Sequence, residues 1–218
     1  MSASKAVKNI LDDINKTIAE LQSRNILLDD RHYSTNCVGK NLYEISYPGK
    51  NDASSIVYDK HVNSNEIMET LLKELQYNIL FYDKGLIQAE FVVDNKKVLK
   101  ERLVFMKKHN KVWNAEEIAQ YESKDEDWFA EEEGVPIMLR VDYAPDDHVN
   151  GDHAATHLTI SNHESCRIPI KGIVTFSEFV RFVLFHFYNI KMELKVCRLR
   201  ENDTITELER KMIHMNWD

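Results

Sequence analysis

The side chains best suited to chemistry gather in one stretch of the chain, residues 136–188, which holds five of the nine histidines. Asp142, His148, His153 and His157 lie close together within it. Imidazole titrates near neutral pH, so these residues can transfer protons as a general acid/base cluster. A carboxylate with two or three imidazoles can also bind a divalent metal, and Asp142, His153 and His157 are the candidate ligands. Hydrogen bonding that only orders the loop is the alternative.

Two segments with strand-like alternation, 137–142 and 157–160, flank the polar loop 146–153. If these strands pair as an antiparallel hairpin, Asp142 and His157 lie on one face, with the two loop histidines above them. The histidine spacing H-x4-H-x3-H matches no metalloenzyme signature. The sequence therefore leaves metal binding and acid–base chemistry as open alternatives at this site.

The apolar segment that follows is typical of a buried helix, with Thr175 and Glu178 forming a capping box at its start. Arg181 and His186 interrupt it with the spacing Arg–apolar–x3–His, which resembles the catalytic motif of HEPN ribonucleases. That resemblance implies that the two residues act on an RNA 2′-hydroxyl and phosphate. HEPN domains are helical bundles, however, whereas this motif follows several strands. The alternative is a buried Arg181 paired with a carboxylate such as Asp142.

The remaining patterns predict a single α+β domain over residues 1–218. We expect an antiparallel sheet of about five to seven strands, packed by helices 64–82 and 176–190, with helical segments at both ends. The N-terminal segment 1–25 is an amphipathic helix that packs on the sheet or on a partner. The other predicted elements are a hairpin at 41–59, a second hairpin from strands 86–93 and 97–106, short strands at 167–170 and 192–196, and a helix after Asp203.

Composition limits the classes of partner. The net charge is −8, so general affinity for the nucleic acid backbone is not expected, although a local basic face remains open. Three distant cysteines without CxxC pairing indicate reduced thiols in a cytoplasmic protein. No signal peptide and no membrane-spanning run is predicted. The acidic segment 109–134, with its aromatic residues, is an insertion or linker, or a surface for a basic partner.

One further set of residues carries a resemblance over roughly residues 86–190. The set is Arg140-Val-Asp142-Tyr143, His148, His153, His157-Leu158, Arg167-Ile-Pro169, Ser177-Glu-Phe179 and Phe187-Tyr188. It resembles a family of bacterial domains of unknown function that are encoded among mobile elements and phage-defence or toxin–antitoxin genes. Thr159 stands where a second histidine is expected, which weakens a transferred catalytic or metal-binding role.

Two functions follow as expectations. The first is a cytoplasmic accessory or interaction subunit of a bacterial antiphage defence or toxin-type system, which binds a neighbour-encoded protein. The alternative is a metal- or histidine-dependent hydrolase, nuclease-like, that acts on RNA or nucleotides through the histidine cluster, and an independent ligand sensor is a third class. A divalent metal is the one cofactor that these residues would hold.

Overall fold

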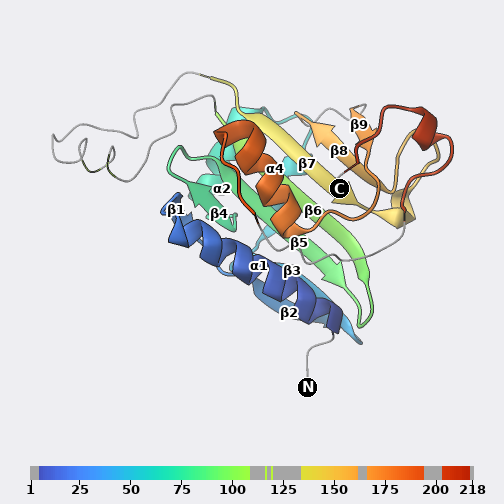
Figure 1. The fold of residues 1–218 in the computed structure, drawn as a ribbon, viewed down its shortest axis with the longest axis horizontal. Helices are drawn as coiled ribbons and strands as arrows, with labels where there is room; N and C mark the ends of the chain where they lie inside the picture. Colours follow the sequence, from blue (N-terminus) through green and yellow to red (C-terminus); the bar gives the residue numbers. More distant parts are fainter. Residues whose placement is uncertain are drawn as a thin grey trace.

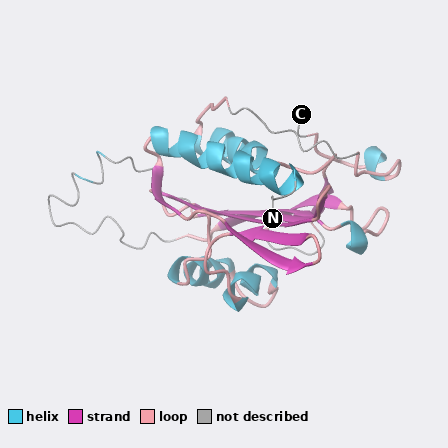
Figure 2. Ribbon diagram, turned by 90° about the horizontal axis from the view of Figure 1, so that it is seen from below, coloured by secondary structure: helices cyan, strands magenta, loops and turns pink. Residues whose placement is uncertain are grey.

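The computed structural model of the protein describes residues 5–108, 116, 119, 134–161, 166–193 and 203–216. In these residues the chain forms one antiparallel sheet of nine strands, with helices on both of its faces (Figures 1 and 2). The α+β class is confirmed, and the sheet is larger than the five to seven strands expected. The acidic segment 109–134 and the strand expected at 192–196 lie almost wholly outside the described residues.

The strands run through most of the described chain. They are β1 (Leu27–Asp30), β2 (Ser34–Gly39), β3 (Leu42–Ser46), β4 (Ile79–Phe81), β5 (Leu86–Val93), β6 (Val98–Lys107), β7 (Ile137–Tyr143), β8 (Thr156–Ile160) and β9 (Arg167–Pro169). Their order is β1-β4-β5-β6-β7-β8-β9. Two strands share one edge of β5: β4 pairs with the first residues of β5, and β3 pairs with its last residues. β3 also pairs with β2. The β5–β6 hairpin is confirmed, as is the pairing of β7 with β8.

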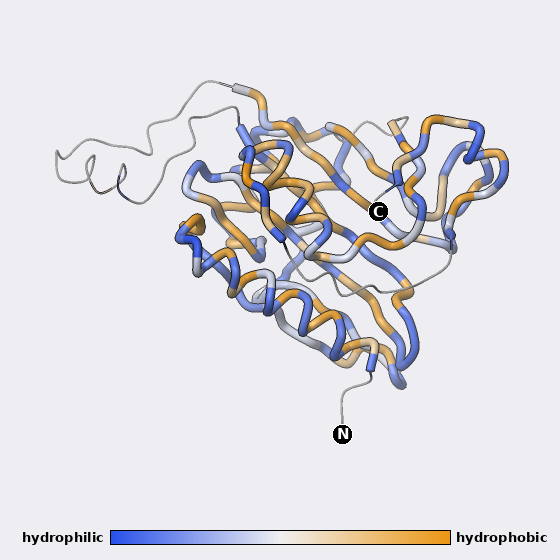
Figure 3. Tube along the Cα trace, in the orientation of Figure 1, coloured by the Kyte–Doolittle hydropathy of each residue, from blue (hydrophilic) through white to orange (hydrophobic). Residues whose placement is uncertain are grey.

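Two helices, α1 (Lys5–Ser23) and α4 (Phe176–Tyr188), cover one face of the sheet (Figure 1). Hydrophobic and hydrophilic residues alternate along α1, as Figure 3 shows. Its apolar side joins α4 and apolar residues of β5 to β7 in the larger core cluster. Burying one such aliphatic side chain contributes about 1.5–3 kcal/mol. The capping box of Thr175 and Glu178 is present, and Asp13 of α1 accepts a hydrogen bond of 3.0 Å from the Ser177 amide.

The opposite face is covered over only part of its area, by α2 (Ser64–Lys73) and the 3-10 helix η1 (Asp52–Tyr58). Apolar residues of α2 pack there on Leu86, Val104, Met106 and Met138. Farther along the same strands, the residues that share this face become polar. α2 does not cover this polar part of the sheet, and the candidate site lies there.

Three expectations about elements were wrong, each for a local reason. The helix predicted at 64–82 ends at Lys73, because Leu75 adopts a left-handed φ of 54° and Ile79–Phe81 forms β4 instead. A short apolar run of this kind fits a strand as well as a helix. The second strand of the hairpin at 41–59 is η1, whose Asn51 side chain accepts a hydrogen bond of 2.9 Å from the Ala53 amide.

The third expectation concerned the C-terminal segment. The helix expected after Asp203 is only the 3-10 turn η3 (Glu209–Lys211). It is held by the side chain of Glu209, whose Oε2 accepts a hydrogen bond of 2.8 Å from the Thr206 amide. Among the described residues, the helices are too short or too polar to span a membrane.

Candidate functional site

The uncovered part of the sheet forms a groove of about 810 Å³. Its floor consists of side chains from β5 to β9, and its rim comes from η1 and from the loop between β7 and β8. Three residues of the predicted cluster, Asp142, His153 and His157, line this groove. The groove therefore contains three of the six candidate site residues.

Cross-strand register arranges the floor of the groove in two rows. Paired residues on neighbouring strands place their side chains on the same face, about 4.5–5.5 Å apart. The first row, which we call the acid–base row, is Glu90, Arg102, Asp142 and His157, on β5 to β8 in order. The second, the donor row, is Arg140, Thr159 and Arg167, on β7 to β9. The two rows are two residues apart along the strands.

His157 is buried and has one defined tautomer. Its Nδ1 lies 2.9 Å from the carbonyl oxygen of Ala154, which can only accept, so Nδ1 carries the proton and Nε2 is left as an acceptor. Burial lowers the pKa of His157, and the Ala154 carbonyl and the charge of Asp142 offset this only in part. The imidazole is therefore neutral at pH 7. Its Nε2 lies 3.8 Å from Oδ2 of Asp142, so one hydroxyl or water between the two acceptors can donate to either.

Asp142 and His153 complete the arrangement around that imidazole. Oδ2 of Asp142 accepts a hydrogen bond of 2.6 Å from Nε of Arg140, whose Nη1 donates to the Val57 carbonyl at 2.9 Å. The His153 ring meets the His157 ring edge-on, with centroids 4.7 Å apart. Burial lowers the pKa of His153, and the nearby charge of Arg167 lowers it further. Both imidazoles of the groove are thus held in the neutral form.

The other three predicted residues lie elsewhere. His148 turns away from the groove, and its Nε2 lies 3.1 Å from Oε1 of the buried Glu209. Arg181 and His186 share a separate pocket of about 560 Å³ beside α4, across the sheet from the groove. The pairing of Arg181 with Asp142 was therefore wrong, and Arg140 is the partner of that carboxylate. The helical-bundle setting of the HEPN motif is absent from the described fold.

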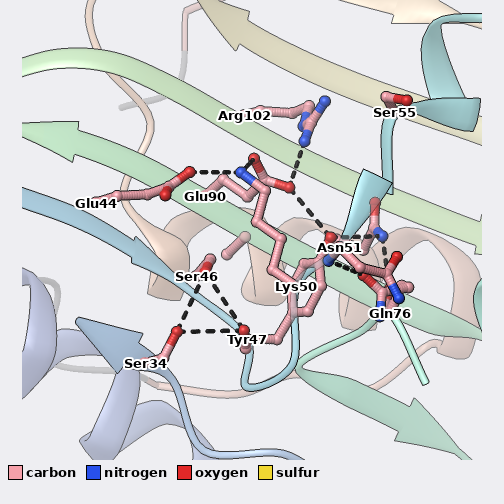
Figure 4. Close-up of polar contacts among 12 residues, drawn as sticks. Ser34, Glu44, Ser46, Tyr47, Lys50, Asn51, Ser55, Gln76, Glu90 and Arg102 are labelled. Carbon is pink, nitrogen blue, oxygen red and sulfur yellow. Dashed lines mark hydrogen bonds and ion pairs between the residues drawn. The ribbon is translucent and has the colours of Figure 1, made fainter. Parts of the chain in front are cut away.

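Sequence reasoning missed an ion-pair network at the other end of the groove (Figure 4). Lys50 reaches Glu44 at 2.5 Å and Glu90 at 2.8 Å, and Glu90 also pairs with Arg102. Tyr47 donates a hydrogen bond of 3.1 Å to Glu90. Burial raises the pKa of Glu90, but Arg102 and Lys50 outweigh this, so that its pKa lies below the usual value. The charged Glu90 holds Arg102 in place at the groove floor.

Tyr58, the last residue of η1, lies against both central arginines. Its ring centroid is 4.5 Å from Cζ of Arg102 and 4.7 Å from Cζ of Arg140, and 51 % of the residue is exposed. Tyr58 also lines the groove. Alternation in β5 and β6 was the one sequence signal for this end of the groove, since Glu90 and Arg102 interrupt apolar strands. Nothing local in the sequence brings Tyr58 or Lys50 to them.

Metal binding finds limited geometric support. Within the described ranges, no group of three His, Cys, Asp or Glu side chains is placed to hold a metal ion. Asp142 already accepts from Arg140, whose positive charge opposes a cation at that oxygen. The metal set of Asp142, His153 and His157 stays a prediction, and the acid–base interpretation needs no additional ligand.

Comparison with known proteins gives one match. The family model described as "Uncharacterized conserved protein (DUF2290)" matches residues 27–217, which include every strand of the sheet and both ends of the groove. No curated protein and no solved structure is detectably similar to the chain. The match supports the resemblance to a domain of unknown function. The chain therefore belongs to the DUF2290 family of uncharacterized conserved proteins.

Proposed function

We propose that the protein is a histidine-dependent hydrolase that cleaves a phosphoester in RNA or a nucleotide, with His157 as the general base. The observation that carries this proposal is the pair of acceptors, His157 Nε2 and Asp142 Oδ2, which lie 3.8 Å apart at the groove floor. A neutral, buried imidazole with a fixed tautomer is suited to accept a proton near pH 7. A carboxylate beside it stabilises the imidazolium that forms.

The proposed step balances with water as the co-reactant. Water bound between the two acceptors attacks phosphorus and gives one proton to Nε2 of His157. The bond from phosphorus to the leaving oxygen breaks, and that oxygen takes the proton back from Nε2. The guanidinium groups of Arg102 and Arg140 face the same space and stabilise the negative charge that builds on the phosphoryl oxygens.

The substrate class rests on the chemistry of the groove. Guanidinium groups match phosphate geometry, and the exposed part of Tyr58 can stack on a nucleobase. These groups form a local site that the net charge of −8 does not reveal.

The test is a single-turnover assay with labelled RNA oligonucleotides and with nucleoside triphosphates, using His157→Gln. We expect this variant to lose at least about 100-fold in rate, in the range that general-base catalysis contributes. His148→Gln is the matched control, because this histidine precedes the same strand but pairs with Glu209 outside the groove. The rate of the unaltered protein should rise with pH and reach half of its plateau below about pH 6.5, since the pKa of His157 lies below its usual value.

Two results would refute the hydrolase. One is full activity in His157→Gln with an unchanged melting temperature. The other is no cleavage of any tested phosphoester by a folded protein. Addition of a chelator distinguishes a metal-dependent hydrolase from one that uses His157 alone, because only the second keeps its rate when the chelator is present.

A second function, that of a cytoplasmic accessory subunit in bacterial antiphage defence or a toxin-type system, is also proposed. The observation that favours it is the exposure of three large apolar side chains in the C-terminal segment. Leu208, Met212 and Ile213 are 47 %, 42 % and 85 % exposed. Such side chains are typical of a surface that contacts another protein. Co-purification with a neighbour-encoded protein, lost in Ile213→Asp but kept in His157→Gln, is the expected result, and equal recovery by both variants would contradict it.

A further inference from the structure

We infer that Thr159 and Arg167 form a subsite for one phosphate group of a small nucleotide. This inference rests on the proposed hydrolase, because it names the group through which the substrate is held. It adds two residues to the site, and neither was a candidate from the sequence. The two lie opposite each other on β8 and β9, on the face that lines the groove.

Thr159 carries a hydroxyl that lacks an acceptor. The residue is only 2 % exposed, and its Oγ1 has no hydrogen-bond partner in the described protein. A buried polar group without a hydrogen-bond partner costs about 1–3 kcal/mol. A ligand that accepts a hydrogen bond from the Thr159 hydroxyl would remove this cost. Because Thr159 lines the groove, that acceptor can come from a bound molecule.

Arg167 supplies the charge. It is partly exposed, and no hydrogen bond or ion pair joins its guanidinium to another of the described residues. Its positive charge contributes to the lowered pKa of both His153 and His157, which places that charge near them. A hydroxyl donor and a guanidinium side by side, neither of which has an acceptor among the described residues, match a phosphate oxygen pair.

The position of the subsite agrees with the chemistry proposed for the neighbouring row. Thr159 and His157 are two residues apart on β8, which places them on the same face at about 6.6–6.8 Å. A phosphate bound by Thr159 and Arg167 therefore lies on the same face of β8 as His157, one residue pair along the strand. Arg140, on the other side of Thr159, adds a second positive charge at this end of the groove.

The charge balance of the groove selects the size of the ligand. Its lining includes six lysine and arginine side chains, and beside them the carboxyl groups of Glu44, Asp52, Glu90, Asp142 and Asp147. A long polyanion would meet nearly as many carboxyl groups as cations along such a surface, whereas one phosphate needs only the donor row. The geometry therefore favours a nucleotide over an extended nucleic acid strand.

The experiment measures binding of inorganic phosphate and of adenosine monophosphate by calorimetry. We expect Arg167→Gln to weaken both by about tenfold or more, the loss typical of a charge-assisted hydrogen bond. Thr159→Val should weaken them by about fivefold, and Thr159→Ser should restore them because it keeps the hydroxyl. Arg181→Gln is the control, since it makes the same charge change beside α4, across the sheet from the groove.

The inference is overturned if the unaltered protein binds neither probe at millimolar concentration, or if Arg167→Gln and Arg181→Gln bind both equally well. Tighter binding with increasing oligonucleotide length would also overturn it in favour of an extended strand. Failure here is distinguishable from failure of the hydrolase. Unchanged phosphate binding by Arg167→Gln, together with lost cleavage in His157→Gln, removes the subsite and leaves the hydrolase.

Discussion

Glu101 gives a quantitative prediction about stability. This β6 residue is 3 % exposed, and neither of its carboxyl oxygens has a hydrogen-bond partner of normal geometry among the described residues. Burial raises its pKa well above the usual value, and the negative charges of Glu178 and Asp142 raise it further. The Val174 amide is near enough to lower the pKa, but it offsets only part of this rise. The folded protein therefore holds this side chain as a neutral acid, while the unfolded chain ionises it.

The sign of the pH dependence follows directly. An acid whose pKa is raised on folding binds more protons in the folded state, so the free energy of unfolding falls as pH rises above the unfolded pKa of about 4.3. One such group changes it by about 1.4 kcal/mol per pH unit between the two pKa values. Glu101→Gln keeps the shape and removes the titration. We expect the stability of the variant relative to the unaltered protein to rise by about this amount between pH 5 and pH 6.

Urea unfolding at pH 5 and pH 6 measures this difference, with Glu69→Gln on the exposed side of α2 as the control. The control should follow the unaltered protein at both values. The reasoning is refuted if Glu101→Gln and Glu69→Gln show the same pH dependence. Such an outcome would mean that Glu101 is ionised in the folded state and has a partner that the described contacts lack.

Three further predictions concern the buried residues beside the end of α4 and the histidine cluster. Lys107→Met should cost about 3–5 kcal/mol in urea unfolding, because it leaves the buried Asp83 without its ion-pair partner, and a loss below 1 kcal/mol would contradict this. Gly85→Ala should destabilise by about 1–3 kcal/mol in the same assay, since a Cβ there meets the Tyr188 hydroxyl, and an unchanged free energy of unfolding would contradict this. Added Zn²⁺ or Mn²⁺ should leave the melting temperature unchanged if the site is metal-free, and a rise that His157→Gln abolishes would establish the metal set instead.

The local part of the site was predictable from the sequence. Alternation in 137–142 and 157–160 fixed which residues share a face, and the pairing of Asp142 with His157 followed from it. His148 could not be placed, because its partner Glu209 lies 61 positions away in the chain. Tyr58 was equally out of reach, since it meets the sheet only after a segment expected to be a strand folds as η1. Contacts of this kind depend on long-range packing, which no local pattern encodes.

The chain leaves the sheet after β3 and returns at β4, and this single excursion, residues 47–78, carries η1, α2 and the rim residue Tyr58. The floor of the groove consists of side chains from β5–β9, which follow this excursion in the sequence. This excursion therefore forms one side of the rim, and the loop between β7 and β8 forms the other. A change in the length of this excursion would alter the rim at Tyr58, and it would also reach the floor, because Lys50 pairs with Glu90 and the Val57 carbonyl accepts from Arg140.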